Sequence, residues 1–331
     1  MPAEWEPHRA TWIAWPHNRG DWPGKFSPIP WIYVEIVRHL HRSERVRIIA
    51  TDRARPSGML ARAGVDLSQI DFFSFPTDRS WTRDYGPMFV RRGSKLAIHN
   101  WHFNGWAKYA NWRRDVRVAG RAARALKLPL LDPGIVLEGG AIDVNGRGTL
   151  LTTEECLLSD TQQRNRGLSR AQLESAFARH LGARHVLWLP RGIAGDDTHG
   201  HIDDIARFVG PSTVVAALED SPADPNYAPL QENFDLLRSM KDQDGRRLRV
   251  VPLPMPAPLY FDGRRVPASY ANFYIANKVV LVPTFHDPND RAALATLAIL
   301  FPDRQVVGIH SVDLVWGLGT LHCLTQQEPR P

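Results

Sequence analysis

The sequence predicts an α/β fold assembled from units of two strands, a helix and a further strand. Short segments rich in β-branched and aromatic residues recur along the chain, and amphipathic helical patterns separate groups of them. No sequence repeat is visible, but this alternation favours a repeated ββαβ unit. No linker divides the 331 residues, so we expect a single domain over residues 1–331.

Nine segments have the residue types that are typical of strands. They are Val46–Thr51, Ile70–Phe75, Met88–Val90, Leu96–Trp101, Gly148–Thr153, His185–Leu189, Val214–Ala217, Leu248–Pro252 and Val279–Val282. The stretches Asp220–Tyr227 and Pro252–Pro258 are expected to be surface loops.

The clearest predicted helix is Ser169–Leu181. Ser169 and Gln172 have the spacing of a capping box, apolar residues follow every four positions, and Gly182 ends the helix. The other predicted helices are Trp31–His41, Arg114–Leu126, Leu230–Met240 and Asp290–Phe301.

Composition narrows the class of protein. With 43% hydrophobic and 23% charged residues, the chain is typical of a globular protein. No apolar run is long enough to cross a bilayer, and the first residues lack the blocks of a signal peptide, so we expect a cytoplasmic protein without a membrane partner.

Net charge raises the question of a nucleic-acid partner. The formal charge is +6 and the sequence pI is about 9.5. The excess is arginine scattered along the chain, without a Lys/Arg block or a platform of stacking aromatic residues. A basic solvated surface is therefore favoured, and a nucleic-acid-binding protein is a less favoured alternative.

Only two cysteines occur, Cys156 and Cys323, so no disulfide framework is predicted. Cys323 follows the glycine-containing turn Gly317–Thr320. Such a turn lets the backbone approach a ligand, and its N–H groups can favour a thiolate. Taken alone, this pattern leaves Cys323 equally open as a buried apolar filler and as a nucleophile.

Residues 195–204, GDDTHGHIDD, contain four carboxylates and two imidazoles. This set suits a general acid/base or a metal site, although capped turns on a charged surface are an alternative. If Ile202–Val209 is a strand, His201 and Asp203 share one face and Asp204 points away.

Two other segments place carboxylates near glycines: residues 81–87, WTRDYGP, and residues 137–140, LEGG. Asp84 is a candidate partner for a cationic group, and Trp81 is a candidate apolar or cation–π wall. A salt-bridged turn and a plain glycine turn are the structural alternatives. Together, a cysteine, a histidine and separated carboxylates are what an enzyme needs to hold a planar cation and attack its central carbon.

Eight motifs occur in one order over nearly the whole chain. They are MPAEWEPHRATWIAWP (1–16), WTRDYGP (81–87), LEGG (137–140), TTEECLL (152–158), WLPRG (188–192), GHID (200–203), ASYANFYIANKVVLVP (268–283) and HCLTQQEP (322–329). In these motifs the sequence resembles the agmatine deiminases, whose family also contains bacterial peptidylarginine deiminases. The resemblance implies the pentein fold of guanidine-modifying enzymes, a five-bladed ββαβ propeller with pseudo-fivefold symmetry and a central active site.

The resemblance also implies roles for single residues. Cys323 would be the nucleophile and His201 the general acid/base, which Glu138 would orient and polarise. Asp84 and Asp203 would hold the guanidinium nitrogens. Asp197 matches a position that helps to bind substrate. Independently of the resemblance, we expect Trp81 to bind substrate as the apolar or cation–π wall.

The nucleophile turn departs from the family pattern. The usual sequence there reads GGGNIHC, whereas this chain has Leu318 in place of a glycine and Thr320 in place of an asparagine. The segment around Pro256–Pro267 also lacks an insertion that is common in plant members. These departures bear on the substrate more than on the chemistry.

The expected reaction is the cofactor-free hydrolysis of agmatine to N-carbamoylputrescine and ammonia through an amidino-cysteine, as in putrescine biosynthesis. Peptidylarginine or another guanidino compound is the alternative substrate. A metallohydrolase that uses His199 and His201 with Asp203 or Asp204 is a less favoured alternative. A homodimer is an option that the sequence leaves open.

Overall fold

The chain forms five sheets of three or four strands and one separate hairpin in the computed structural model, which describes residues 1–331. The sheets contain β18 (Thr325–Pro329), β1 (His8–Ala14), β2 (Arg45–Ile49) and β3 (Ile70–Phe73); β4 (Met88–Arg92), β5 (Lys95–His99) and β6 (Leu130–Leu131); β7 (Asp143–Val144), β8 (Thr149–Thr153) and β9 (His185–Leu189); β10 (Ala206–Gly210), β11 (Thr213–Leu218) and β12 (Arg249–Pro254); and β15 (Tyr274–Ile275), β16 (Val279–Thr284) and β17 (Gln305–His310). The hairpin consists of β13 (Tyr260–Phe261) and β14 (Arg264–Arg265).

The five sheets share one pairing pattern. β4 pairs antiparallel with β5, and β5 pairs in parallel with β6; the sheets of β7 to β9, β10 to β12 and β15 to β17 repeat this order. In the remaining sheet β18 pairs antiparallel with β1, and β2 and β3 follow in parallel. The two ends of the chain therefore complete one unit together.

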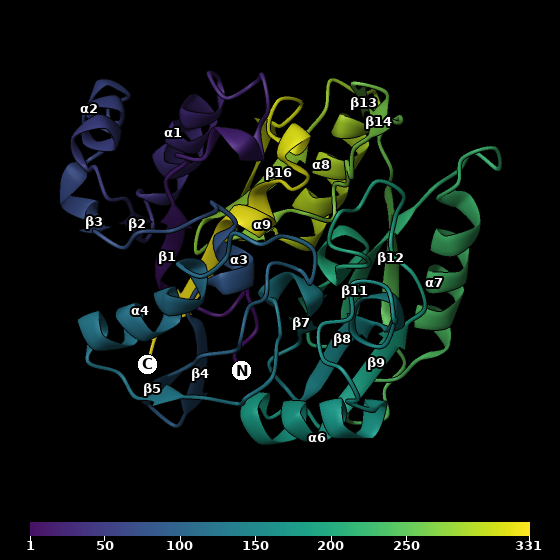
Figure 1. The fold of residues 1–331 in the computed structure, drawn as a ribbon. Helices are drawn as coiled ribbons and strands as arrows, with labels where there is room; N and C mark the ends of the chain where they lie inside the picture. The colour runs from purple at the N-terminus through teal and green to yellow at the C-terminus, as the bar shows by residue number, and fades with distance from the viewer.

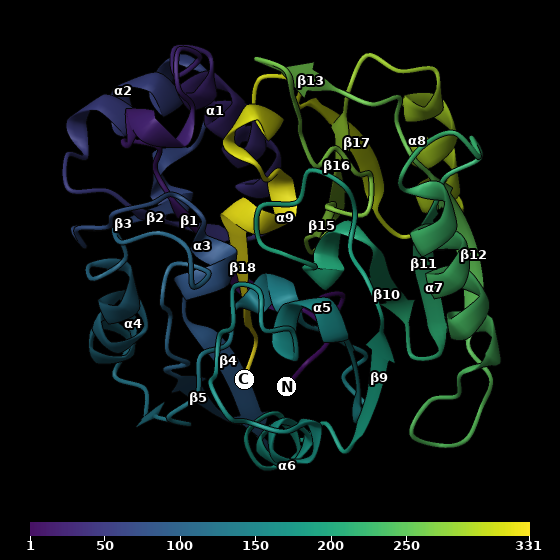
Figure 2. The same cartoon turned by 45° about the vertical axis from the view of Figure 1, so that its right-hand side comes forward.

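Helices connect the parallel strands because parallel neighbours require a crossover. The longer helices are α1 (Ile29–Leu40), α2 (Ala54–Arg62), α4 (Val118–Leu126), α6 (Arg170–Leu181), α7 (Tyr227–Ser239) and α8 (Asn289–Leu300). They lie at the periphery of the molecule (Figure 1), whereas the one-turn helices α3 (Thr82–Tyr85), α5 (Glu154–Leu157) and α9 (Leu321–Leu324) lie nearer its middle (Figure 2). None of the helices is both long and apolar enough to cross a bilayer.

The five predicted helices and nine predicted strands are confirmed, with ends that differ by a few residues. In α6 the capping box of Ser169 and Gln172 is present, and Gly182 ends the helix in a left-handed conformation, with φ of 72°. The predicted loop at Pro252–Pro258 is wrong over its first three residues, which pair as part of β12.

The conditional strand Ile202–Val209 is also wrong over its first four residues. Ile202–Asp204 form a 3-10 turn, η5, and the strand β10 begins only at Ala206. The alternation of strand side chains therefore does not explain where Asp203 and Asp204 point.

Several elements were not predicted: β1, β17, β18, α2 and the shortest strands. The most informative is β18, TQQEP, whose five residues are all buried although each is polar or proline. Two of its side chains have long-range partners: Gln327 Oε1 accepts a hydrogen bond from Arg83 Nη1 at 2.7 Å, and Glu328 Oε2 accepts one from Trp12 Nε1 at 2.9 Å. Hydrophobic patterns cannot find a strand that is buried by paired polar contacts.

Candidate active site

The predicted site residues come together from separate units of the fold. Asp84 lies on α3, Glu138 precedes the 3-10 turn η4 (Gly139–Ala141), Asp203 lies in η5 next to His201, and Cys323 lies on α9. These short elements contact one another, α3 with α9 and η4, and η4 with η5. The side chains of all five residues are buried.

Cys323 is surrounded by carboxylates. Its Sγ atom lies 3.7 Å from Asp203 Oδ2. Burial raises the pKa of the Cys323 thiol well above its ordinary range, and the charges of Asp203, Asp204 and Asp84 raise it further. Without a bound cation, the sulfur therefore stays protonated at neutral pH.

Asn272 is a residue of this site that the sequence reasoning missed. Its Nδ2 donates hydrogen bonds to Cys323 Sγ at 3.1 Å and to Asp204 Oδ1 at 3.0 Å. Its Oδ1 accepts from Thr320 Oγ1 at 2.7 Å and from the His322 backbone N–H at 3.1 Å. The expected backbone N–H donors to the sulfur are thus replaced by a side-chain amide, whose orientation is fixed by Thr320. The only sequence feature that could have indicated Asn272 is its place in the motif ASYANFYIAN.

His201 faces three carboxylates. Its Nδ1 lies 3.9 Å from Asp84 Oδ1 and 3.9 Å from Asp203 Oδ1, and its Nε2 lies 3.9 Å from Glu138 Oε2. Burial alone would lower the pKa of the imidazole, but Asp84, Cys156 and Glu138 outweigh burial and raise it well above 6.5. The imidazolium form, a proton donor, therefore prevails at neutral pH.

The carboxylates differ in charge state. Burial raises the pKa of Asp84 to about 6, with Asp203 and Glu138 adding to the shift. Burial also opposes ionisation of Glu138, but the Arg164 guanidinium, 3.0 Å away, and His201 outweigh it and hold the pKa of Glu138 at about 2. Glu138 is therefore a fixed anion, whereas Asp84 is costly to ionise until a cation arrives.

Hydrogen bonds from neighbouring groups orient the carboxylates of Asp84 and Asp203. Asp84 accepts hydrogen bonds from Trp106 Nε1 at 2.8 Å and from the Gly140 N–H at 3.1 Å. Asp203 Oδ2 accepts from His322 Nδ1 at 2.7 Å, while its Oδ1 has no hydrogen-bond partner. One buried oxygen of Asp203 thus remains available for a cation.

His322, which the sequence reasoning did not single out, extends this network. Its Nε2 lies 2.8 Å from Glu4 Oε2, and Glu4 also pairs with Arg83 at 3.1 Å and with Arg207 at 2.9 Å. The network ties the N-terminal segment to the segment that carries Cys323. The sequence feature that could have indicated His322 is its position directly before Cys323.

Gly140 makes the close approach possible. A Cβ atom at this position would lie 2.5 Å from His201 Nδ1 and 2.9 Å from Asp84 Oδ1. Such distances are far below van der Waals contact, so only glycine fits. The second glycine of LEGG therefore has a packing role and is not merely a turn residue.

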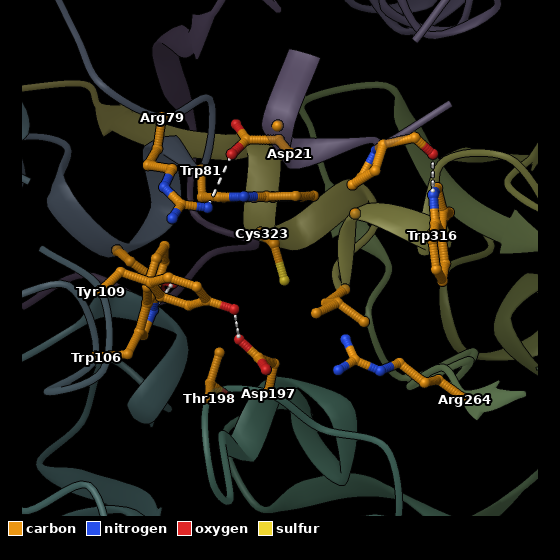
Figure 3. A pocket seen from close by; sticks show the side chains of 15 residues that line it. Asp21, Arg79, Trp81, Trp106, Tyr109, Asp197, Thr198, Arg264, Trp316 and Cys323 are labelled. Carbon is orange, nitrogen blue, oxygen red and sulfur yellow. Dashed lines mark hydrogen bonds and ion pairs between the residues drawn. The ribbon is translucent and has the colours of Figure 1, made fainter. Parts of the chain in front are cut away.

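The sulfur of Cys323 points into a cavity of about 210 Å³ (Figure 3). Its lining residues are Gly20, Asp21, Pro23, Arg79, Trp81, Asp84, Trp106, Tyr109, Asp197, Thr198, Arg264, Trp316, Gly317, Leu318 and Cys323. Of the predicted site residues, Trp81, Asp84, Asp197 and Cys323 line the cavity, whereas Glu138, His201 and Asp203 do not.

The outer wall of the cavity holds carboxylates that are paired with cations. Asp197 is bonded to Lys108 Nζ at 2.5 Å and to Tyr109 Oη at 2.6 Å, and Asp21 Oδ1 accepts from Arg79 Nη1 at 2.9 Å. The other oxygen of Asp21 has no hydrogen-bond partner. Asp21 therefore keeps one buried carboxylate oxygen unpaired at the wall of the cavity.

Leu318 occupies the position at which the family pattern has glycine. It adopts a left-handed conformation, with φ of 69°, and it lines the cavity. This conformation is unfavourable for a residue with a branched side chain. The turn accommodates this conformation, and Leu318 forms part of the cavity wall.

The metallohydrolase alternative requires His199 and His201 to converge, and they do not. His199 lies 3.3 Å from Ser159 Oγ and 3.6 Å from Glu155 Oε1, outside the cluster that surrounds His201. His199 and His201, which the sequence suggested as metal ligands together with Asp203 or Asp204, therefore do not form one metal site.

Known proteins share both the sequence and the fold. Residues 1–329 match the family described as Porphyromonas-type peptidyl-arginine deiminase. Agmatine deiminase from Pseudomonas fluorescens is 37% identical over 356 residues, covering 100% of this chain and 95% of the relative. Agmatine deiminase from Stutzerimonas stutzeri is 37% identical over 360 residues, with the same shares covered.

Solved structures agree with this relationship. Agmatine deiminase of Enterococcus faecalis superposes with a TM-score of 0.91 at 31% identity, over 100% of this chain and 95% of that one. A dimethylarginine dimethylaminohydrolase superposes with a TM-score of 0.54 at 13% identity, over 97% of this chain and 99% of that one. The second likeness concerns the fold alone, and the chain has the α/β pentein fold.

Proposed function

The chain belongs to the Porphyromonas-type peptidyl-arginine deiminase family, and from this premise we propose that it is an agmatine deiminase. It is a hydrolase of C–N bonds that converts agmatine to N-carbamoylputrescine and ammonia, a step toward putrescine. The observation that carries the proposal is the buried Cys323 sulfur within 3.7 Å of Asp203 in a cavity that Asp84 also lines.

The finer architecture is part of the proposal. Five units with one pairing pattern support a five-bladed arrangement about a pseudo-fivefold axis, within a single domain of residues 1–331. A site between the units explains why Asp84, Glu138, the pair His201 and Asp203, and Cys323 come from different ones. A homodimer and a cytoplasmic location stay expectations from the sequence.

The first step is the capture of a guanidinium. Asp84 and Asp203 would accept charge-assisted hydrogen bonds from its nitrogens, with the unpartnered Oδ1 of Asp203 as one acceptor. The bound cation offsets the carboxylate field at Cys323. Because that field is one cause of the raised thiol pKa, substrate binding favours the thiolate.

In the second step the Cys323 thiolate adds to the guanidinium carbon, and a tetrahedral carbon forms. The His201 imidazolium, held near Asp84 and Glu138, donates its proton to the leaving nitrogen, and ammonia departs. An amidino-thioether on Cys323 remains. His201, now neutral, accepts a proton from water, and the hydroxide displaces the sulfur to leave a ureido product.

The wall of the cavity supports an amine-tailed substrate. Asp21 lines the cavity with one unpartnered carboxylate oxygen, which suits the ammonium of agmatine. A peptide bond and a carboxylate, as in peptidylarginine, would bring no positive charge to this oxygen.

The proposal is tested by parallel assays of ammonia and ureido product with agmatine, free arginine and an arginyl peptide at equal concentrations. We expect turnover of agmatine with the highest kcat/KM. Turnover of the peptide but not of agmatine would replace agmatine by peptidylarginine, and turnover of none would contradict deiminase function.

A further inference from the structure

The second cysteine, Cys156, lies directly behind the catalytic imidazole. It is buried on the one-turn helix α5, whose start is fixed by a hydrogen bond from the Cys156 N–H to Thr153 Oγ1 at 3.0 Å. No step of the deiminase reaction uses this thiol. Its neighbours suggest another role.

Cys156 Sγ, a ring nitrogen of His201 and a carboxylate oxygen of Glu138 all lie within 4.8 Å of one another. Two of these groups have a polar atom without a hydrogen-bond partner, Glu138 Oε2 and His201 Nε2, although both side chains are almost completely buried. Buried polar atoms without partners are rare and indicate a group that can accept a ligand.

We infer that Cys156, His201 and Glu138 form an inhibitory site for a thiophilic divalent cation, with Zn²⁺ as the best fit. A thiolate, an imidazole and a carboxylate are the three ligand types that zinc prefers, and the sulfur selects against Mg²⁺ and Ca²⁺.

To bind one ion, the three donor atoms, which lie within 4.8 Å of one another, must move closer together. Bonds of about 2.0–2.3 Å to a tetrahedral ion place neighbouring donor atoms roughly 3.2–3.8 Å apart. The Nε2 of His201 is now 3.9 Å from Glu138 Oε2. Arg164 holds the other oxygen of Glu138 at 3.0 Å and so orients the free oxygen, as outer contacts do in metal sites.

The charges also balance. The ion displaces the proton of the Cys156 thiol, and the thiolate and the Glu138 carboxylate together neutralise the dication. His201 binds as neutral imidazole through Nε2, so the imidazolium releases one proton to solvent when the ion binds. Arg164 keeps its pairing with Glu138.

Metal binding would stop turnover at His201. With the ion on Nε2, the ring can no longer become an imidazolium, so it cannot protonate the leaving nitrogen or accept a proton from water. This consequence rests on the proposed function, whereas metal binding itself does not.

The test uses the full chain in a Cys323→Ala background, which removes the competing thiol. After treatment with chelator, the variant is dialysed against Zn²⁺ and the bound metal is measured. We expect one Zn²⁺ per chain, and with Co²⁺ a thiolate-to-metal absorption band in the near ultraviolet. Adding Cys156→Ser should remove the band and weaken binding at least about 100-fold.

Two more variants separate ligation from misfolding. Adding Glu138→Gln should also weaken binding, whereas His199→Ala, which changes a histidine outside the trio, should leave affinity and the Co²⁺ band unchanged. Absence of Zn²⁺ uptake in Cys323→Ala, or uptake and band that survive Cys156→Ser, would overturn the inference. Failure of the metal-free wild type to hydrolyse agmatine would instead count against the proposed function.

Discussion

The reaction centre and the outer wall of the cavity both contain carboxylates, but they pair them differently. At the wall, Asp197 has both oxygens bonded, to Lys108 and to Tyr109. At the centre, Glu138 and Asp203 each keep one buried oxygen without a hydrogen-bond partner, and Asp84 and Cys323 have raised pKa values.

This difference separates two tasks. The centre holds uncompensated negative charge and is complete only with a cation, so it provides both binding and activation of the nucleophile. At the wall, Asp197 is paired on both oxygens and partly exposed, so its contacts orient the substrate and contribute less free energy. Asp21 is the exception at the wall, since it is buried and keeps one oxygen without a hydrogen-bond partner. Variants at the centre should therefore cost far more activity than variants at the wall.

The largest effect is expected for Cys323→Ala. Because the nucleophile is lost, kcat for agmatine should fall by about 10⁵-fold or more, while agmatine binding persists. Ammonia release measures the first quantity and calorimetric titration the second. Cys156→Ser is the matched control and should stay active; an active Cys323→Ala variant would refute the assignment of the nucleophile.

Asp84→Asn should affect activity and stability in opposite directions. Loss of a carboxylate that grips the guanidinium should lower kcat/KM about 10³-fold. In the folded free protein the pKa of Asp84 is raised from 3.8 to about 6, so ionisation of Asp84 lowers stability as pH rises through that interval.

The asparagine variant lacks this penalty. Between pH 4 and pH 8 its free energy of unfolding should therefore gain up to about 3 kcal/mol relative to wild type. Thermal or urea unfolding at the two pH values measures the difference, with Asp197→Asn as the control at the wall. If the difference in free energy of unfolding between Asp84→Asn and wild type were the same at both pH values, ionisation of Asp84 would not destabilise the folded protein.

Asn272→Ala should have an intermediate effect. Its amide is the hydrogen-bond donor to Cys323 Sγ, so its loss should lower kcat about 10²-fold and move the pH dependence of Cys323 alkylation by iodoacetamide to higher pH. A residue with a purely structural role would not shift that alkylation profile.

Asn277→Ala is the matched control for Asn272. It removes a nearby asparagine of the same segment whose amide bonds to the backbone of His8. It should leave the alkylation profile unchanged. Equal profiles for Asn272→Ala and wild type would show that the amide does not assist the thiolate.

The smallest effect is expected at the wall, for Asp21→Asn. If its free oxygen meets the ammonium of agmatine, KM should rise about tenfold with little change in kcat. Steady-state kinetics with agmatine and with a guanidine that lacks the amine test this, since only agmatine should lose affinity. An equal loss for both substrates would mean that Asp21 acts through Arg79 and not on the tail.

The sequence by itself determined the helices, most strands and the chemistry of the centre. Periodicity and capping residues act over a few positions, which is why Ser169–Leu181 could be delimited closely. The motifs around Asp84, Glu138, His201 and Cys323 indicated a guanidine-modifying site because they resemble a family, not because their spacing requires one.

Only the tertiary structure decided which partners each group has. Asn272 reaches Cys323 across 51 positions, His322 reaches Glu4 across 318, and the polar strand β18 is buried against β1. Such contacts depend on how distant segments pack. Local sequence therefore cannot show which buried oxygens stay unpaired, and in this protein those oxygens set the charge of the site.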